Sequence, residues 1–153
     1  MISKLKFSFI ASDTPRLRSY LHFFSKEKFR LDKIFLLKKN STAENLKFLN
    51  NSYFDNSQKT FDNFIKKNKS KIKLIDSNTA NNANLIKNLL KTKSKYVIFC
   101  SNPGDILKKD FFNINKKIIH VHPGDIFKYK GSTPYYYQII EKKSLTFTSF
   151  FMQ

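Results

Sequence analysis

Residues 118–134, with the sequence IIHVHPGDIFKYKGSTP, are the segment around which the rest of this chain is organised. The segment holds two of the chain's three glycines, two of its four prolines and two of its three histidines. A short β-branched run precedes the histidines and a polar loop follows them, which predicts a buried strand that ends in a turn. Ligands of open α/β sheets bind at the carboxyl ends of the strands. The segment therefore predicts a functional site at this strand end.

The sequence on either side alternates between apolar strand-like runs and helices with one apolar face. The strand-like runs cover residues 6–11, 33–37, 71–75, 96–100, 117–121 and 145–152. Helical periodicity covers residues 15–24, 81–93, 105–111 and 135–141, and two further helices are expected after Ser41 and around residues 61–65. This alternation predicts an α/β fold, a single Rossmann-like domain over residues 1–153 with a mostly parallel sheet and helices on both faces. We expect strands 96–100 and 117–121 to be adjacent and central, and strand 71–75 to lie nearer an edge.

The chain is strongly basic, with 29 Lys and Arg against 11 Asp and Glu and a formal net charge of +18. Such a charge suits a polyanionic partner such as a nucleic acid. The lysines are spread along the chain in pairs and do not form one stripe, whereas real nucleic-acid faces cluster their charge. We therefore favour compositional drift as the origin of the charge. A basic nucleic-acid-binding α/β domain remains an alternative.

Two features bear on the compartment. The single cysteine, Cys100, excludes an internal disulfide framework and a cysteine-rich zinc site, and its apolar neighbours predict a buried thiol. No segment approaches the ~18 apolar residues of a membrane span, and the amino-terminal apolar run is too short for a signal peptide. We expect a cytoplasmic protein without a membrane partner.

The two histidines of the central segment, His120 and His122, are two residues apart. On a strand this spacing places both side chains on the same face. Two imidazoles are too few to hold a metal, and no third ligand is identifiable, so we predict no metal site. Residues at such strand ends are often functional, although satisfied core histidines would show the same pattern.

The segment as a whole resembles the catalytic loop of the formyltransferases that use 10-formyltetrahydrofolate, which include methionyl-tRNA formyltransferase and the sugar N-formyltransferases. That loop has Asn-x-His followed by Pro or Gly, and then a turn with an aromatic residue, Arg or Lys, and Gly. Here His122-Pro123, Tyr129-Lys130-Gly131 and Pro134 match at the expected separations. The resemblance is specific from about residue 96 onwards and loose before it.

The resemblance implies formyl transfer from 10-formyltetrahydrofolate, as co-substrate, to an amino group. His122 would be catalytic, donating to the oxyanion or carrying a proton, and His120 would take the place of the family's asparagine as a donor. The residues expected to bind the co-substrate are Asn102, Pro123, Gly124, Tyr129 and Gly131. The acceptor favoured by the loop sequence is an amino-sugar nucleotide rather than tRNA. Nothing in the sequence indicates the oligomeric state.

The chain departs from the family pattern in three ways. His120 stands where the family has asparagine, Phe127 stands where a proline is usual in the loop, and Gln153 is the last residue, before the position of the family's catalytic aspartate. The carboxyl-terminal end therefore looks truncated. This keeps open a second hypothesis, a non-catalytic or partial formyltransferase-fold remnant that lacks this aspartate. Whether the chain is an enzyme is left open by the sequence.

Overall fold

The structure is a computed structural model that describes residues 5–12, 14–37, 63, 66–131 and 134–153. In chain order its elements are β1 (Lys6–Ser12), α1 (Pro15–Lys26), β2 (Arg30–Leu37), η4 (Lys69–Lys71), β3 (Ile72–Ile75), α3 (Ala83–Leu90), β4 (Tyr96–Cys100), η5 (Lys109–Ile114), β5 (Lys117–His122), α4 (Pro134–Lys142) and β6 (Thr148–Met152), where η marks a 3₁₀ helix. The helices expected after Ser41 and around residues 61–65 fall outside the described ranges, apart from residue 63.

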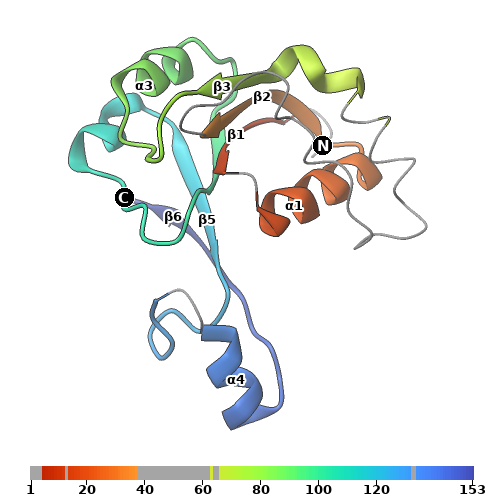
Figure 1. The fold of residues 1–153 in the computed structure, drawn as a ribbon, viewed down its shortest axis with the longest axis vertical. Coiled ribbons are helices and arrows are strands. Elements are labelled where there is room, and N and C mark those ends of the chain that lie inside the picture. Colours follow the sequence, from red (N-terminus) through yellow and green to blue (C-terminus); the bar gives the residue numbers. More distant parts are fainter. Residues whose placement is uncertain (1–4, 13, 38–62, 64–65, 132–133) are drawn as a thin grey trace.

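The strands form one six-stranded sheet in the order β3-β2-β1-β4-β5-β6. All neighbouring strands are parallel except β5 and β6, which are antiparallel. Figure 1 shows this sheet with helices packed along it. The α/β class and the mostly parallel sheet are as predicted. So are the adjacent, interior positions of β4 and β5 and the edge position of β3.

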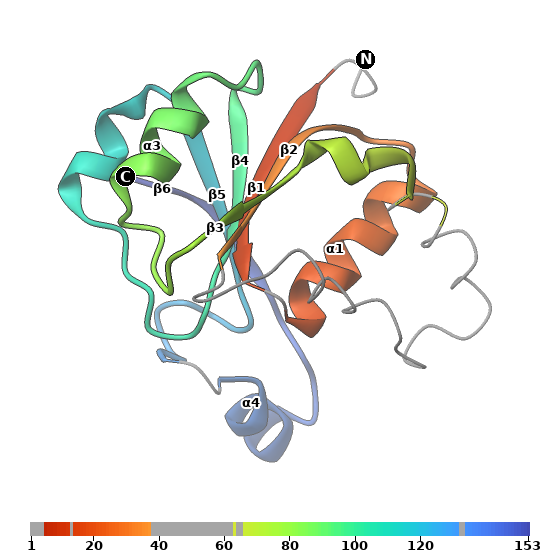
Figure 2. The same ribbon diagram turned by 45° about the horizontal axis from the view of Figure 1, so that its top comes forward.

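Helical elements cover both faces of the sheet, with α1 on one side and α3 on the other (Figure 2). An apolar core lies on each face of the sheet. Alternate side chains of β1 pack into one core or the other, because successive residues of a strand point to opposite faces. Phe9 packs with Leu17 and Leu21 of α1, and all three are fully buried. Ile10 packs in the other cluster with Leu85 of α3. Two apolar layers therefore hold the parallel strands from both sides.

The first helix begins as the sequence predicts. The Thr14 side chain accepts a hydrogen bond of 3.3 Å from the backbone N–H of Leu17, and Pro15 is the first helical residue. A threonine cap satisfies one of the unpaired N–H groups at a helix start, and proline has no N–H to leave unpaired there. This start fixes α1 directly after the carboxyl end of β1.

The prediction of an α-helix at residues 105–111 is wrong. The chain there forms a loop without regular secondary structure, followed by the 3₁₀ helix η5, and Ile106, which would lie on the apolar face of the predicted helix, is 79% exposed. The side chain of Asn81 donates to the carbonyl of Ile106 and accepts from the N–H of Lys108, both at 2.7 Å. These two backbone groups are therefore bonded outside the segment and are not free for helical pairing.

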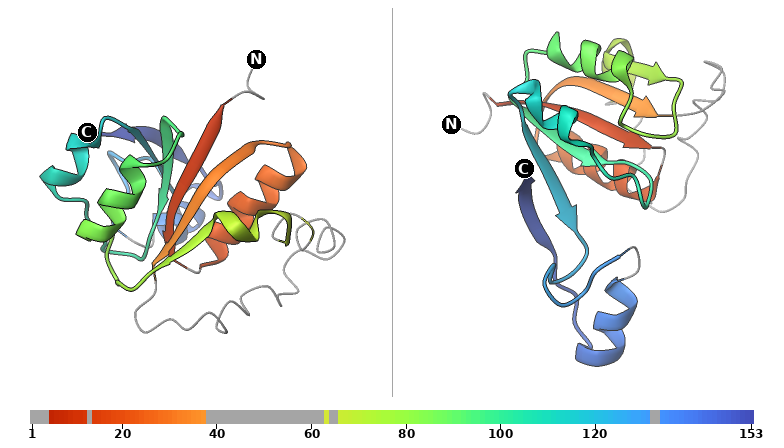
Figure 3. Two further views of the ribbon diagram at one scale, coloured as in Figure 1. Left: turned by 90° about the horizontal axis from the view of Figure 1, so that it is seen from above. Right: turned by 90° about the vertical axis from the view of Figure 1, so that its left-hand side faces the viewer.

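The sixth strand begins at Thr148, three residues later than expected, because Thr146 is bonded elsewhere: its N–H donates to Oε1 of Gln138 at 3.0 Å. Residues 123–131 and 134–147, including α4, lie beyond the carboxyl end of β5 and apart from the main body (Figure 3). Strands β5 and β6 connect this extension to the sheet. Among the described residues, no helix is long and apolar enough to span a membrane.

Candidate functional site

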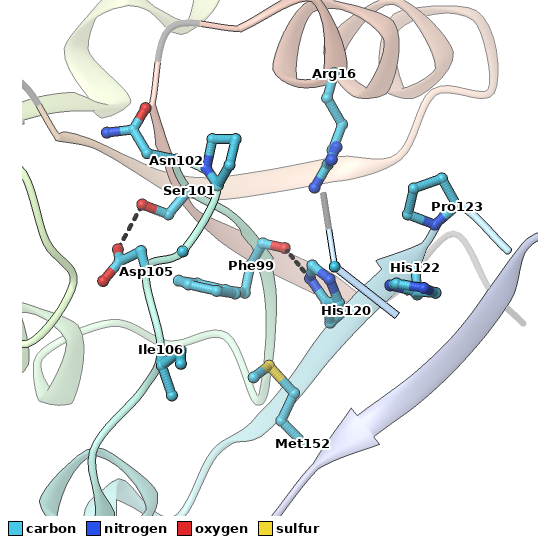
Figure 4. Close-up of a pocket in the computed structure, with 13 residues that line it drawn as sticks. Arg16, Phe99, Ser101, Asn102, Asp105, Ile106, His120, His122, Pro123 and Met152 are labelled. Carbon is cyan, nitrogen blue, oxygen red and sulfur yellow. Dashed lines mark hydrogen bonds between the residues drawn. The ribbon is translucent and has the colours of Figure 1, made fainter. Parts of the chain in front are cut away.

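A cavity of about 660 Å³ opens at the carboxyl ends of the central strands. Figure 4 shows it between the loop that follows β4, the end of β5 and the start of α1. The described residues that line it are Arg16, Phe99, Ser101, Asn102, Pro103, Gly104, Asp105, Ile106, His120, His122, Pro123, Gly131 and Met152. It opens at the strand end where residues 118–134 predicted a functional site.

His120 has a defined protonation pattern in this cavity. Its Nδ1 lies 3.0 Å from the backbone oxygen of Phe99 on the neighbouring strand. A carbonyl oxygen can only accept, so Nδ1 carries the proton and the neutral ring keeps a lone pair on Nε2. Phe99 lies on β4 and Phe150 on β6, the two strands that flank β5. Their ring centroids lie 5.9 and 5.7 Å from that of the imidazole. The imidazole is thereby held in one orientation.

The surroundings of His120 also favour its neutral form. Burial lowers the pKa of His120 below its usual value, and electrostatic interaction with the nearby Arg16 and His122 lowers it further. The hydrogen bond to Phe99 opposes these effects and raises the pKa, but the net direction is downward. At neutral pH His120 is therefore an uncharged imidazole.

His122 is oriented by the loop rather than by the sheet. Its Nε2 lies 2.6 Å from the backbone oxygen of Tyr129, so Nε2 is the protonated nitrogen and Nδ1 carries the lone pair. The two histidines thus adopt opposite tautomers. Both line the same cavity, as their spacing on one strand predicted.

Asp105 is the one carboxylate among the described lining residues, and its oxygens are already engaged. Oδ1 accepts from the hydroxyl of Thr79 at 2.6 Å, and Oδ2 accepts from the N–H of Ala80 at 2.8 Å and the hydroxyl of Ser101 at 2.6 Å. These bonds fix the loop after β4 against the loop that precedes α3. Asp105 therefore shapes the cavity wall.

The five residues expected to bind a co-substrate divide into two groups. Asn102, Pro123 and Gly131 line the cavity. Gly124 and Tyr129 are buried within the loop and do not line it. A Cβ added to Gly124 would lie 3.1 Å from Nε2 of Gln138, so this glycine provides close packing inside the loop.

Polar bonds hold the loop against α4 and β6. Gln138, fully buried, donates from Nε2 to the carbonyl of Pro123 at 3.3 Å. The hydroxyl of Thr148 donates to the carbonyl of Gly124 at 2.6 Å, and the hydroxyl of Tyr129 donates to a carboxylate oxygen of Glu141 at 2.7 Å. The side chains of the extension therefore fix the loop that orients His122.

Arg16 was missed by the sequence reasoning. It follows Pro15 in the first turn of α1, and its side chain extends toward His120 in Figure 4. It comes from a segment a hundred residues away, so no local motif indicates it. A weak signal was present, because only three of the 29 basic residues are arginines, Arg16, Arg18 and Arg30.

The arrangement combines two imidazole lone pairs, a guanidinium and an open loop backbone. Imidazoles at a cavity can accept and return protons, and a guanidinium binds phosphate or carboxylate groups. Within the described part of the chain, no cluster of three or more His, Cys, Asp or Glu side chains could hold a metal ion. The chemistry available from these side chains is proton transfer beside a bound anion.

This chain resembles known proteins in its fold but matches none of them by sequence. No protein-family model matches the sequence, and no curated protein does. Among solved structures, the chain is similar to a sugar N-formyltransferase from Shewanella sp. (TM-score 0.54, 16% identity), with 97% of this chain and 51% of that chain covered.

Two further formyltransferases show the same likeness. Phosphoribosylglycinamide formyltransferase from Bacillus halodurans has a TM-score of 0.64 at 10% identity, covering 97% of this chain and 72% of that one. A 4-N formyltransferase from Francisella tularensis has a TM-score of 0.51 at 18% identity, covering 97% and 50%. This chain spans about half the length of the first and third of these structures. The likeness establishes a fold shared with formyltransferases.

Proposed function

We propose, from the formyltransferase fold of this chain, that it transfers a formyl group from 10-formyltetrahydrofolate to the amino group of a sugar nucleotide. The observation that carries the proposal is the pairing of His120 and His122 in one cavity at the carboxyl ends of the central strands. Their loop is also the segment whose sequence resembles the catalytic loop of these enzymes.

The described residues are suited to a folate donor. Phe99, Met152 and the largely exposed Ile106 give the cavity an apolar surface for a flat ring. A Cβ at Gly104 or Gly131 would meet nothing within 4 Å, so the backbone of both loops faces open space. Backbone N–H and carbonyl groups there are available to the polar edge of a pterin. When bound, the donor supplies an activated formyl carbon.

His122 and His120 would handle protons during the transfer. The attacking amine loses a proton, and the departing nitrogen of the donor gains one. An imidazole can carry a proton between these two positions. His122 is the last residue of β5, directly before the loop that resembles the family's catalytic loop, so its loss should affect transfer most directly.

The cavity also contains a group suited to an anionic acceptor. A guanidinium such as that of Arg16 is able to bind phosphate oxygens in a fixed fork geometry. An amino-sugar nucleotide carries both the amine and the phosphates that such a site requires. One structural neighbour, the protein from Shewanella sp., is a sugar N-formyltransferase. We propose this acceptor class over tRNA.

The test is turnover of 10-formyltetrahydrofolate with amino-sugar nucleotides, measured by release of tetrahydrofolate. Wild-type protein and the His22→Ala variant should turn over, and the His122→Ala variant should lose about 10²–10⁴-fold in rate. His22 is the matched control because it is the one histidine outside the cavity. Absence of turnover by the wild type, with donor binding retained, would favour the non-catalytic hypothesis. A steep dependence of nucleic-acid binding on salt would favour the nucleic-acid hypothesis.

A further inference from the structure

We propose that His120 is the proton acceptor for the attacking amine, through its Nε2. This inference rests on the proposed formyl transfer and assigns one role within it. It differs from the donor role that the sequence resemblance implied for this position. The argument uses the tautomer, the other polar groups of the cavity and the charges near the ring.

The tautomer of His120 decides whether its Nε2 donates or accepts a hydrogen bond. Because Nδ1–H is bonded to the carbonyl of Phe99 at 3.0 Å, the neutral ring has no second N–H to offer. Its Nε2 is an acceptor. An amide side chain at the same position would present an N–H donor, whereas neutral His120 accepts a hydrogen bond from the amine N–H.

The carboxylate of the cavity is a poor alternative. Both oxygens of Asp105 already accept bonds from Thr79, Ala80 and Ser101. Protonating it would disrupt the contact between two loops. Figure 4 shows Asp105 turned toward Ser101 and away from His120. The histidine is thus the more accessible base.

The charges around His120 explain how it remains ready to accept a proton. Arg16 from α1 and His122 from the same strand face it, and with burial they keep its pKa below the usual value. The ring is therefore unprotonated before the amine attacks. After attack, the amine nitrogen carries a positive charge and becomes strongly acidic, so even a weak base suffices.

Protons and bonds balance over the whole transfer. The amine lone pair forms the new bond to the formyl carbon, and the carbonyl π pair moves onto oxygen. His120 Nε2 takes one amine proton and becomes an imidazolium. When the oxygen pair re-forms the carbonyl, the bond from the formyl carbon to the donor nitrogen breaks, and that nitrogen receives the proton from His120. No further reactant is required.

The first test is independent of activity. Two-dimensional ¹⁵N–¹H NMR of the histidine side chains at pH 8, on the full chain without substrates, should show a protonated Nδ1 and an unprotonated Nε2 for His120. His122 should show the opposite tautomer, which provides an internal reference. A protonated Nε2 on His120 would overturn the inference and leave the proposed function standing.

The second test compares matched variants in the turnover assay. His120→Asn, which keeps a polar planar group but cannot carry a proton, should lower kcat about 10²–10⁴-fold with little change in KM. His22→Asn is the control, and melting curves establish that both variants fold. A small base such as imidazole should restore part of the rate of His120→Ala.

The outcomes separate the two proposals. Wild-type kcat in His120→Asn overturns the acceptor role alone. An inactive wild type overturns formyl transfer and, with it, this role. Rate loss in His120→Asn without rescue of His120→Ala by imidazole would indicate a structural effect and also overturn the acceptor role.

Discussion

The carboxylate of Asp105 accepts a hydrogen bond of 2.8 Å from the backbone N–H of Ala80, which lies 25 residues earlier in the chain. This bond joins the loop after β4 to the loop before α3. The hydroxyls of Thr79 and Ser101 donate to the same carboxylate. The side chain of Asp105 therefore fixes the position of one wall of the cavity that His120 also lines.

We expect Asp105→Ala to lower the free energy of unfolding by about 1–3 kcal/mol, because it leaves the N–H of Ala80 without its partner. Asp105→Asn should cost less, since its remaining oxygen can serve Ala80 and the Thr79 hydroxyl can rotate. Urea unfolding measures both, with Asp110→Ala, an exposed residue of η5, as the control. Equal losses in the two Asp105 variants would indicate that charge, not hydrogen bonding, is responsible.

Gly124 should tolerate substitution less well than Gly104. Both have positive φ, 146° and 81°, so alanine is strained at either position, by about 1–3 kcal/mol. At Gly124 the new Cβ would also lie 3.1 Å from Gln138 Nε2 and 3.3 Å from Cβ of Pro134, whereas at Gly104 it would meet nothing. Thermal unfolding of Gly124→Ala and Gly104→Ala measures the difference. A smaller loss at Gly124 would contradict this packing role.

Cys100 should be nearly inert in the folded protein. Burial raises the pKa of its thiol to about 12, an effect that the nearby Arg16 only partly offsets. The reactive species is the thiolate, so reaction with a disulfide reagent at pH 8 should be slow. In denaturant the same thiol should react rapidly. Comparable rates in the two conditions would show that Cys100 is accessible.

The depressed pKa of His120 predicts a loss of stability in acid. The folded pKa lies below the unfolded value, so the unfolded state binds a proton first as the pH falls. The contribution of this group to stability is therefore present above about pH 6.5 and is lost as the pH falls through the folded value. Melting temperatures between pH 8 and pH 5 should fall less in His120→Asn than in wild type. His22→Asn serves as the control, and an identical pH dependence in wild type and His120→Asn would contradict the prediction.

Much of the architecture followed from local patterns. The apolar runs of β4 and β5 predicted central strands because parallel strands buried on both faces are continuously apolar. The helical periodicity of residues 15–24 predicted α1. The failure at residues 105–111 has a physical cause, because Asn81 takes backbone bonds that a helix would need, and such a contact has no signature in the local sequence.

The sequence by itself determined the α/β class, the strand end at which the cavity opens and the shared face of His120 and His122, because these depend on periodicities of two and 3.6 residues. Only the tertiary structure decided the tautomers of those histidines, the presence of Arg16 beside them and the inward packing of Gly124. Each depends on atoms that meet across strands or loops, such as Nδ1 of His120 and the carbonyl of Phe99. Hydrogen-bond partners brought together by folding, and not residue spacing, set which nitrogen carries the proton.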